Sequence, residues 1–194
     1  MSLDASQMAK ALWSARRDGG RLPPPQGLDE ETAFAIQDAL IAAAAGHPVI
    51  AWKVGGTGPG IPEKMGIASP LVGPIFERYV HVADGDEPVV ELPAAHGLAV
   101  EVELVFRFGE DLAPGDSPSD VLDLVDGVAV GIEFPGSRWT SPTEPSGPGI
   151  IADHAGNSAL LVGSSRTGAT WIFRRSSPRS RSTASTPEAE TARS

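Results

Sequence analysis

The stretch that decides the fold is GLAVEVELVFRF at residues 97–108, the clearest strand in the sequence. Because side chains alternate between the two faces of a strand, its apolar and acidic residues separate. One face holds Val100, Val102, Leu104 and Phe106, and the other holds Glu101, Glu103 and Val105. The two glutamates are about 6.5–7 Å apart at Cα and repel each other. On a solvated face this repulsion costs little, whereas in a cleft it raises one pKa or requires a cation, and both alternatives stay open here.

A third acid strengthens the second alternative. Glu133 directly follows the apolar strand VAVGI at residues 128–132, and a carboxylate after so buried a run needs a partner. If this strand ends near Glu101 and Glu103, three carboxylates converge. Such oxygen ligands, without cysteine or paired histidine, favour Mg²⁺ or Mn²⁺ over Zn²⁺. Three protein ligands also leave coordination positions free for a chelating substrate.

The elements around these strands predict an α+β fold. Helices come first and strands later, without the regular alternation that builds a parallel sheet. Two helices are predicted near the N-terminus, one over residues 3–17 and one that begins after Asp29 as its N-cap. The further expected elements are a buried strand over 49–54, a helical turn over 62–65, a hairpin or extended pair over 80–92, a helix over 119–125, and core strand at 150–152 and 160–163.

We expect three parts in the chain: a helical region over 1–48, a β-rich catalytic core over 49–163, and a tail over 164–194. The tail differs sharply in composition, with 6 arginines and 2 glutamates against 9 Lys/Arg and 23 Asp/Glu in residues 1–163. Of its 31 residues, 19 are serine, arginine or threonine. So little apolar surface cannot offset the entropy of ordering, which predicts disorder from about residue 174.

Composition excludes several classes of protein. The net charge of −10 argues against nucleic acid as a partner. The absence of cysteine excludes disulfides and thiolate metal sites, and it fits a cytoplasmic location. The longest apolar run, 39–45, is too short to cross a bilayer, and the N-terminus has no apolar segment typical of a secretory signal. There is no GxSxG motif, which argues against an α/β-hydrolase.

Several short motifs together resemble a known family. They are LWSAR at 12–16, AWKVG at 51–55 with Thr57, the Glu101-x-Glu103 strand, Glu133 followed by Ser137-Arg138, and IADHA at 151–155. In order and rough spacing, residues 8–163 resemble the 2-keto-4-pentenoate hydratase branch of the fumarylacetoacetate hydrolase superfamily. That branch also contains 4-oxalocrotonate decarboxylases.

The resemblance implies roles for particular residues. It implies a divalent metal bound by Glu101, Glu103 and Glu133. It implies that Lys53 lies in the pocket as a charge partner or acid/base group, although simple pairing with a core carboxylate is the alternative. Asp153 would lie near the metal and support it, and Ser137 and Arg138 would hold substrate or the fold. Trp52 is expected in the core, and His154 on the surface or with its ring nitrogens satisfied.

The resemblance also implies an activity. Members of the branch are cytoplasmic, oligomeric, Mg²⁺- or Mn²⁺-dependent enzymes with a helical N-terminal part and a β-rich core. The implied reaction is hydration of a 2-hydroxypenta-2,4-dienoate-type 2-oxo acid in aromatic-compound catabolism, with a cation stabilising the enolate. Leu71 stands where some hydratases have aspartate, so a related decarboxylase and an inactive family member remain alternatives.

The C-terminal end departs from the family. Members continue past Gly163 with further core strands, and nothing in 164–194 resembles them. We therefore expect a truncated member whose tail comes from a shifted reading frame and whose C-terminal strands are missing. Such a chain would expose apolar surface and unpaired strand edges.

Overall fold

The computed structural model describes residues 4–83, 87–92, 99–112, 115, 117–141 and 146–163. The elements in chain order are α1 (Ala5–Asp18), α2 (Glu30–Ala43), β1 (Val49–Gly55), α3 (Ile61–Met65), β2 (Leu71–Phe76), η1 (Glu77–Tyr79), β3 (Val80–Val82), β4 (Glu101–Phe108), α4 (Pro118–Asp123), β5 (Val125–Pro135), α5 (Gly147–Ala152), η2 (His154–Gly156) and β6 (Asn157–Val162). Helices precede most of the strands, and the predicted α+β class is confirmed. The expected disordered tail lies outside the described residues.

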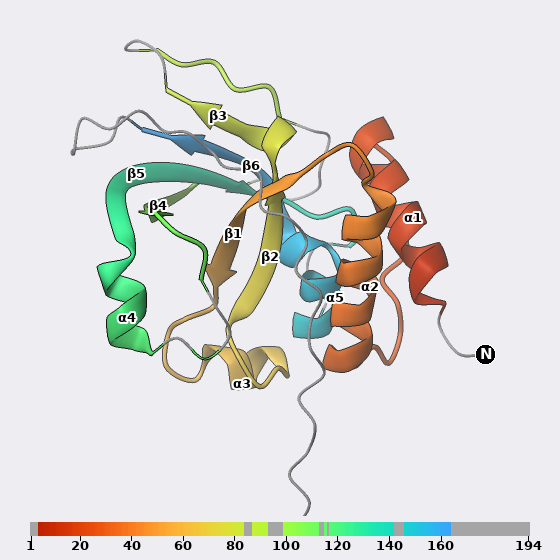
Figure 1. The fold of residues 1–194 in the computed structure, drawn as a ribbon. Helices are drawn as coiled ribbons and strands as arrows, with labels where there is room; N and C mark the ends of the chain where they lie inside the picture. The colour runs from red at the N-terminus through yellow and green to blue at the C-terminus, as the bar shows by residue number, and fades with distance from the viewer. Residues whose placement is uncertain are drawn as a thin grey trace, which may run out of the picture.

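Helices α1, α2 and α5 pack side by side on one flank of the molecule, as Figure 1 shows. Both long helices begin at an aspartate that accepts hydrogen bonds from free N–H groups of the first turn. Asp4 accepts from the backbone N–H groups of Ser6 and Gln7, and Asp29 accepts from that of Thr32 at 2.8 Å. The two predicted N-terminal helices are confirmed. None of the described helices is long and apolar enough to span a bilayer.

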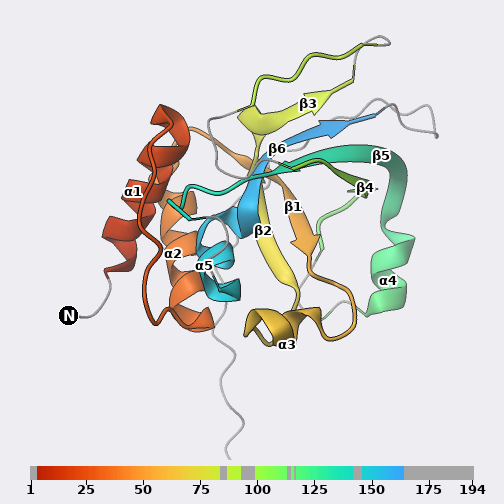
Figure 2. The ribbon, with the colours of Figure 1, turned by 180° about the vertical axis from the view of Figure 1, so that it is seen from behind.

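The strands form two sheets that lie beside this helical flank (Figure 2). β1 and β2 form an antiparallel pair. The second sheet has the order β3-β6-β5-β4, in which β3 pairs with β6 in parallel and the other neighbours are antiparallel. A large apolar core lies between the helices and β2, and a smaller one lies between the sheets. The smaller core consists of Ile75, Ala129, Leu160 and Val162.

Three expectations were wrong, and one strand was missed. The strand at Val80–Val82 does not form a hairpin with residues 87–92, which have no regular structure, but pairs with β6. Residues 150–152 lie in α5 rather than in a strand. β2 was not predicted at all. Trp52 is not in the core, because Lys53 takes the inward position on β1 and its neighbour is left 51% exposed.

The alternation of β4 is the reverse of that in an ordinary core strand. Its apolar face is open to solvent, with Val102 at 75% and Leu104 at 64% exposure, and Val130 of the neighbouring β5 is 57% exposed. Val105, on the acidic face, packs against the smaller core. The glutamate face of β4 is therefore turned towards the body of the molecule.

Candidate metal centre and its buried support

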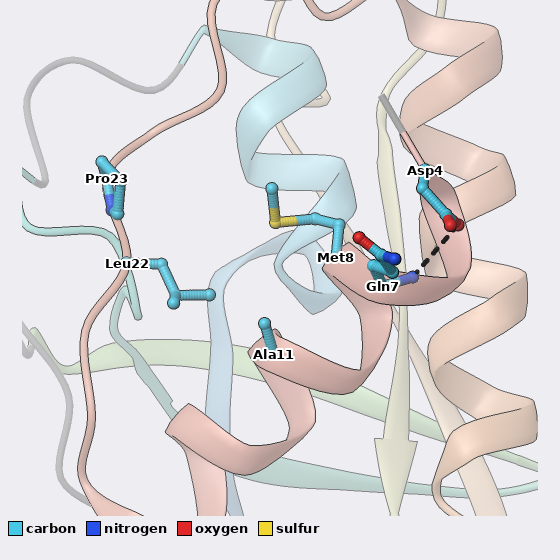
Figure 3. A pocket seen from close by; sticks show the side chains of 6 residues that line it. All are labelled: Asp4, Gln7, Met8, Ala11, Leu22 and Pro23. Carbon is cyan, nitrogen blue, oxygen red and sulfur yellow. Dashed lines mark hydrogen bonds between the residues drawn. The ribbon is translucent and has the colours of Figure 1, made fainter. Parts of the chain in front are cut away.

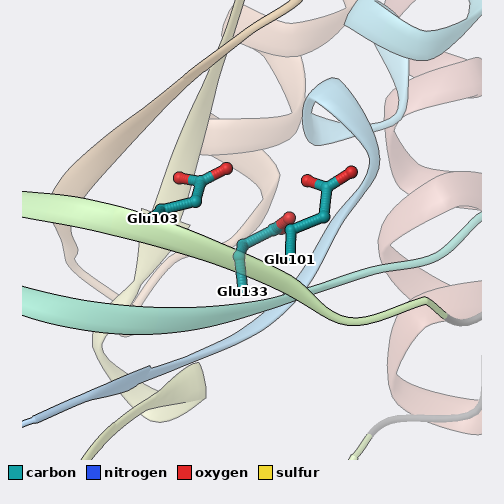
Figure 4. A group of neighbouring side chains, drawn as sticks. All are labelled: Glu101, Glu103 and Glu133. Atoms are coloured by element: carbon teal, nitrogen blue, oxygen red, sulfur yellow. The ribbon is translucent and has the colours of Figure 1, made fainter.

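Three carboxylates converge where β4 meets β5. Glu101 is the direct cross-strand partner of Glu133, and Glu103 is paired with Gly131, so all three glutamates share one face of the sheet. One carboxylate oxygen of each lies within 4.8 Å of the others (Figure 4). Glu133 is buried, Glu103 is half-buried and Glu101 is exposed, so the cluster runs from the interior to solvent. The predicted convergence is confirmed as geometry.

A glycine on β5 allows close packing beside the cluster. Gly131 is opposite Glu103, and a Cβ atom there would lie 2.6 Å from Cγ2 of Val105 and 3.3 Å from Cδ1 of Leu160. Any side chain at this position would therefore push the two strands apart. Gly131 thus allows Val105 of β4 and Leu160 of β6 to pack closely over β5 beside the cluster.

Lys53 brings a positive charge to the cluster from the other sheet. Its Nζ lies 3.0 Å from Oε2 of Glu133, and both side chains are buried. The two alternatives for Lys53 therefore coincide, because the carboxylate with which it pairs is itself a member of the acidic cluster.

Asn157 is a neighbour of the cluster that the sequence did not single out. Its Nδ2 donates a hydrogen bond of 2.8 Å to Oε1 of Glu133. Burial raises the pKa of Glu133, and Glu101 adds to the rise, whereas Lys53 and the hydrogen bond from Asn157 oppose it. The only signal in the sequence is a polar residue at the first position of an apolar strand, which is too common to identify a site.

The three carboxylates fit a hard divalent cation. Three carboxylates and one ammonium group leave two negative charges in excess, and like charges directly across a strand pair are destabilising without a counterion. Each oxygen of Glu133 accepts one hydrogen bond from a side chain and keeps a lone pair for a further ligand. All the candidate metal ligands are carboxylate oxygens, which Mg²⁺ and Mn²⁺ prefer.

Asp153 and Arg138 form a second buried ion pair behind the cluster. The Nε of Arg138 lies 2.6 Å from Oδ1 of Asp153, and its Nη1 donates to Oγ of Ser158. Its Nη2 donates to the backbone oxygens of Asp153 and Asn157. Burial alone would raise the pKa of Asp153, but the Arg138 guanidinium outweighs it and holds that pKa below its usual range.

These contacts bear on two predicted roles. The guanidinium of Arg138 is occupied by protein partners at all three nitrogens, which favours support of the fold over contact with substrate. Asp153 contacts Arg138 rather than the glutamates. Its link to the cluster is therefore indirect and runs through Arg138 and Asn157 to Glu133. Ser137 is half-buried and its Oγ accepts from the backbone N–H of Trp139. The catalytic role of Asp153 and the substrate role of Ser137 and Arg138 stay predictions.

His154 differs from what the sequence suggested. It is fully buried, and neither ring nitrogen has a hydrogen-bond partner among the residues that the structure describes. Its Nδ1 lies 3.7 Å from Oδ1 of Asp153, and its ring meets Phe76 edge-on. Burial lowers the pKa of His154 to about 3, and the positive charges of Arg16 and Arg138 add to the effect although Asp153 opposes it. The imidazole is therefore neutral at pH 7.

A pocket at the N-terminal end of the molecule shares no residue with the cluster. It has a volume of about 330 Å³ and is lined by Asp4, Gln7, Met8, Ala11, Leu22 and Pro23 (Figure 3). Its lining is mostly apolar, and the Asp4 carboxylate is already engaged in capping α1. Without converging polar groups, it is a weaker candidate for chemistry than the carboxylate cluster.

No family model matches the chain. A 2-keto-4-pentenoate hydratase of Paraburkholderia xenovorans (strain LB400) is 26% identical over 168 residues, which are 81% of this chain and 60% of the relative. The TodF product hydratase of Pseudomonas putida (strain F1) is 29% identical over 164 residues, covering 80% of this chain and 59% of the relative. The chain thus spans about 60% of the length of the curated relatives that it matches.

Solved structures are similar in fold. The 4-oxalocrotonate decarboxylase of Pseudomonas putida G7, complexed with magnesium and adipate, matches with a TM-score of 0.68 and 17% identity, covering 84% of this chain and 64% of that chain. The same enzyme with calcium and acetate matches with a TM-score of 0.64. The chain is therefore similar in sequence to 2-keto-4-pentenoate hydratases and similar in fold to a 4-oxalocrotonate decarboxylase, in agreement with the resemblance carried by the motifs of residues 8–163.

Proposed function

We propose that the chain is a metal-dependent lyase of the hydratase kind, which adds water to a 2-hydroxypenta-2,4-dienoate-type 2-oxo acid. The observation that carries the proposal is the buried Glu133, held between Lys53 and two further glutamates of the same sheet face. The names of the curated relatives support the reaction class.

Glu101, Glu103 and Glu133 would hold the ion, with Mg²⁺ or Mn²⁺ as the candidates. Bound there, the ion supplies positive charge for the carboxylate and the 2-oxygen of the substrate. The similar decarboxylase structures support this choice, because they contain magnesium or calcium together with a carboxylate compound.

The protein's own contribution is centred on Lys53. Its ammonium lies in a water-poor site against Oε2 of Glu133, so it holds that carboxylate in place and keeps a positive charge next to the negative substrate. Its Nζ lies 3.0 Å from a member of the cluster, and we infer that Lys53 delivers a proton to the carbon chain or accepts it back as the double bonds shift. The exposed Glu101 leaves the solvent side open for substrate.

A related decarboxylase is the second candidate, and one residue favours it. Leu71, where some hydratases have aspartate, is buried in the apolar core and supplies no proton. Loss of CO₂ would produce the same kind of enolate without the need for an acid at that position. An inactive relative that binds metal without turnover is the third alternative. A homo-oligomeric state and a cytoplasmic location stay predictions.

The full chain should be incubated with Mg²⁺ or Mn²⁺ and either 2-hydroxypenta-2,4-dienoate or 4-oxalocrotonate. Loss of the diene absorbance with the first compound supports the hydratase, and release of CO₂ from the second supports the decarboxylase. Glu103→Ala should abolish either activity, whereas Glu110→Gln, an exposed acid just beyond β4, should not. Binding of Mn²⁺ without turnover of any 2-oxo acid would select the inactive alternative.

A further inference from the structure

We propose that Asn157 is a positioning residue that holds Glu133 in the orientation needed for metal binding, and that Arg16 of α1 fixes the direction of the Asn157 amide. The inference rests on the metal site of the proposed function but not on the reaction. It makes the first helix of the chain part of the site's scaffold, although α1 and the glutamates are far apart in sequence.

The contacts of Asn157 leave its side chain little freedom. It is fully buried at the start of β6. Its Nδ2 donates to Oε1 of Glu133 at 2.8 Å, and its Oδ1 faces Nη2 of Arg16 at 3.4 Å. Its backbone oxygen accepts from Nη1 of Arg16 and from Nη2 of Arg138. Backbone and side chain are therefore both anchored.

The direction of the amide follows from the chemistry of its two neighbours. A guanidinium only donates hydrogen bonds and an ionised carboxylate only accepts them. The oxygen of the Asn157 amide must therefore face Arg16, and its N–H must face Glu133. In a rotated amide, Oδ1 would face the carboxylate of Glu133 and Nδ2 would face the guanidinium of Arg16. Two acceptors and two donors would then oppose each other in the interior, which is costly for buried groups.

Arg16 is a buried cation that joins α1 to the start of β6 without a carboxylate partner among the described residues. It is 1% exposed, and its described partners are the backbone oxygens of Asn157 and Ser158, the Asn157 side chain and the face of the Tyr79 ring, 4.0 Å away. No carboxylate lies within ion-pair distance of it in the part of the chain that the structure describes. A buried cation without an ion pair is costly, and burial lowers the pKa of Arg16 to about 9. Orientation of the Asn157 amide is a role that would explain why this cost of burying the Arg16 guanidinium is retained.

The result is a carboxylate fixed at both oxygens. Lys53 holds Oε2 of Glu133 and Asn157 holds Oε1, so the terminal torsion of the side chain is set before any ion arrives. Without Asn157, only the hydrogen bond from Lys53 restrains the carboxylate about that broad torsion. Hydrogen bonds that orient a metal ligand typically change metal affinity by about 10–100-fold when they are removed.

The test is titration of the full chain with Mn²⁺ alone. The concentration of free Mn²⁺ is measured at each step by electron paramagnetic resonance. We expect Asn157→Ala to weaken binding by about 10–100-fold. Ser158→Ala is the matched control, since it also removes a buried polar group that contacts Arg138 but its hydroxyl is turned to that arginine and not to Glu133. Unfolding in urea measures the stability of each variant, and Ser158→Ala should lose stability without losing affinity.

The role of Arg16 is tested by a double-mutant cycle on the same Mn²⁺ affinity. Arg16→Lys should weaken binding in the wild-type background and have little further effect in the Asn157→Ala background, because it acts through the amide. If the two effects simply add, the proposed link from Arg16 to Asn157 is wrong. Should Asn157→Ala not fold, Asn157→Leu keeps the volume of the side chain and removes its N–H.

The possible failures are distinguishable. Unchanged Mn²⁺ affinity in the folded Asn157 variant would overturn this inference and leave the proposed function intact. Wild-type chain that binds Mn²⁺ but turns over no 2-oxo acid would overturn the proposed reaction only. Wild-type chain that binds no Mn²⁺ would overturn both.

Discussion

The pairing of Lys53 with Glu133 leads to an unusual prediction for Lys53→Met. The ammonium and the carboxylate are buried and lie 3.0 Å apart, so removal of the ammonium leaves an uncompensated negative charge in the interior. Breaking a buried pair in this way costs about 3–5 kcal/mol of the free energy of unfolding. We therefore expect the metal-free variant to be much less stable than wild type at pH 8, where protonation of Glu133, whose pKa is raised by burial, offsets less of this cost than at lower pH.

The same substitution should tighten metal binding. In wild type the Lys53 ammonium competes with a cation for the negative charge of the three glutamates, and in Lys53→Met it does not. We expect the Kd for Mn²⁺ to fall at least about tenfold, which corresponds to about 1.4 kcal/mol. Mn²⁺ at 100 times its Kd should in addition raise the stability of the folded chain by about 2.7 kcal/mol. General damage to the fold would not produce a variant that is less stable without metal and yet binds metal more tightly.

The assay is urea unfolding at pH 8 with and without Mn²⁺, together with direct Mn²⁺ titration. Lys64→Met is the control, because Lys64 is exposed on α3 and its loss should change stability by less than about 0.5 kcal/mol. The double variant Lys53→Met/Glu133→Leu should recover much of the lost stability and lose metal binding. Weaker Mn²⁺ binding by Lys53→Met would refute the charge competition and show that orientation of Glu133 by Lys53 has the larger effect, and unchanged stability would refute the buried pair.

Two predictions concern the turn behind the site. Below pH 6.5 the unfolded chain takes up a proton on His154, whereas the buried ring, with a pKa of about 3, does not. The contribution of His154 to the free energy of unfolding is therefore complete above pH 6.5. It falls by up to about 1.4 kcal/mol per pH unit below that pH. His154→Asn, which tolerates the left-handed backbone at φ 57°, should remove that part of the acid sensitivity in urea unfolding at pH 7 and pH 5, and an unchanged pH dependence would contradict the burial of a neutral ring. Gly73→Ala should destabilise by about 1–3 kcal/mol or more, because a Cβ there would lie 2.3 Å from the backbone oxygen of His154. Gly20→Ala, with no contact closer than 3.4 Å, is the control in the same thermal unfolding assay, and equal melting temperatures for the two variants would show that the close approach is not present.

The parts of the fold that could be predicted are those with local signals. An aspartate before a run of apolar residues at helical spacing predicts α2 with its cap, since the hydrogen bond from Thr32 to Asp29 spans only three residues. The alternation in β4 separates its glutamates from its valines without any knowledge of the partner strand. The convergence with Glu133 needed only the assumption that two neighbouring strands pair in one register, and that register is present.

The parts that could not be predicted depend on long-range contacts. The contact of Arg16 with Asn157 joins residues 141 positions apart, and although Arg16 ends the LWSAR motif, the helix that carries it gives no sign of this partner. The pairing of β3 with β6 is equally non-local, so a short apolar segment next to turn residues was assigned to the nearest partner along the chain. His154 offers no signal either, because its burial follows from the turn that Gly73 allows beside it.

The inverted orientation of β4 is itself an argument for function. A strand that turns Val102 and Leu104 to solvent and Glu103 towards the body of the molecule loses the free energy of burying two large apolar side chains. It also gathers three like charges around the buried Glu133. A shift of the strand by one residue would reverse both effects, so packing among the described residues does not account for the observed face. A divalent cation at the three carboxylates would offset the electrostatic part of this cost, and the fold is arranged as if the acids, rather than the valines, determine which way β4 faces.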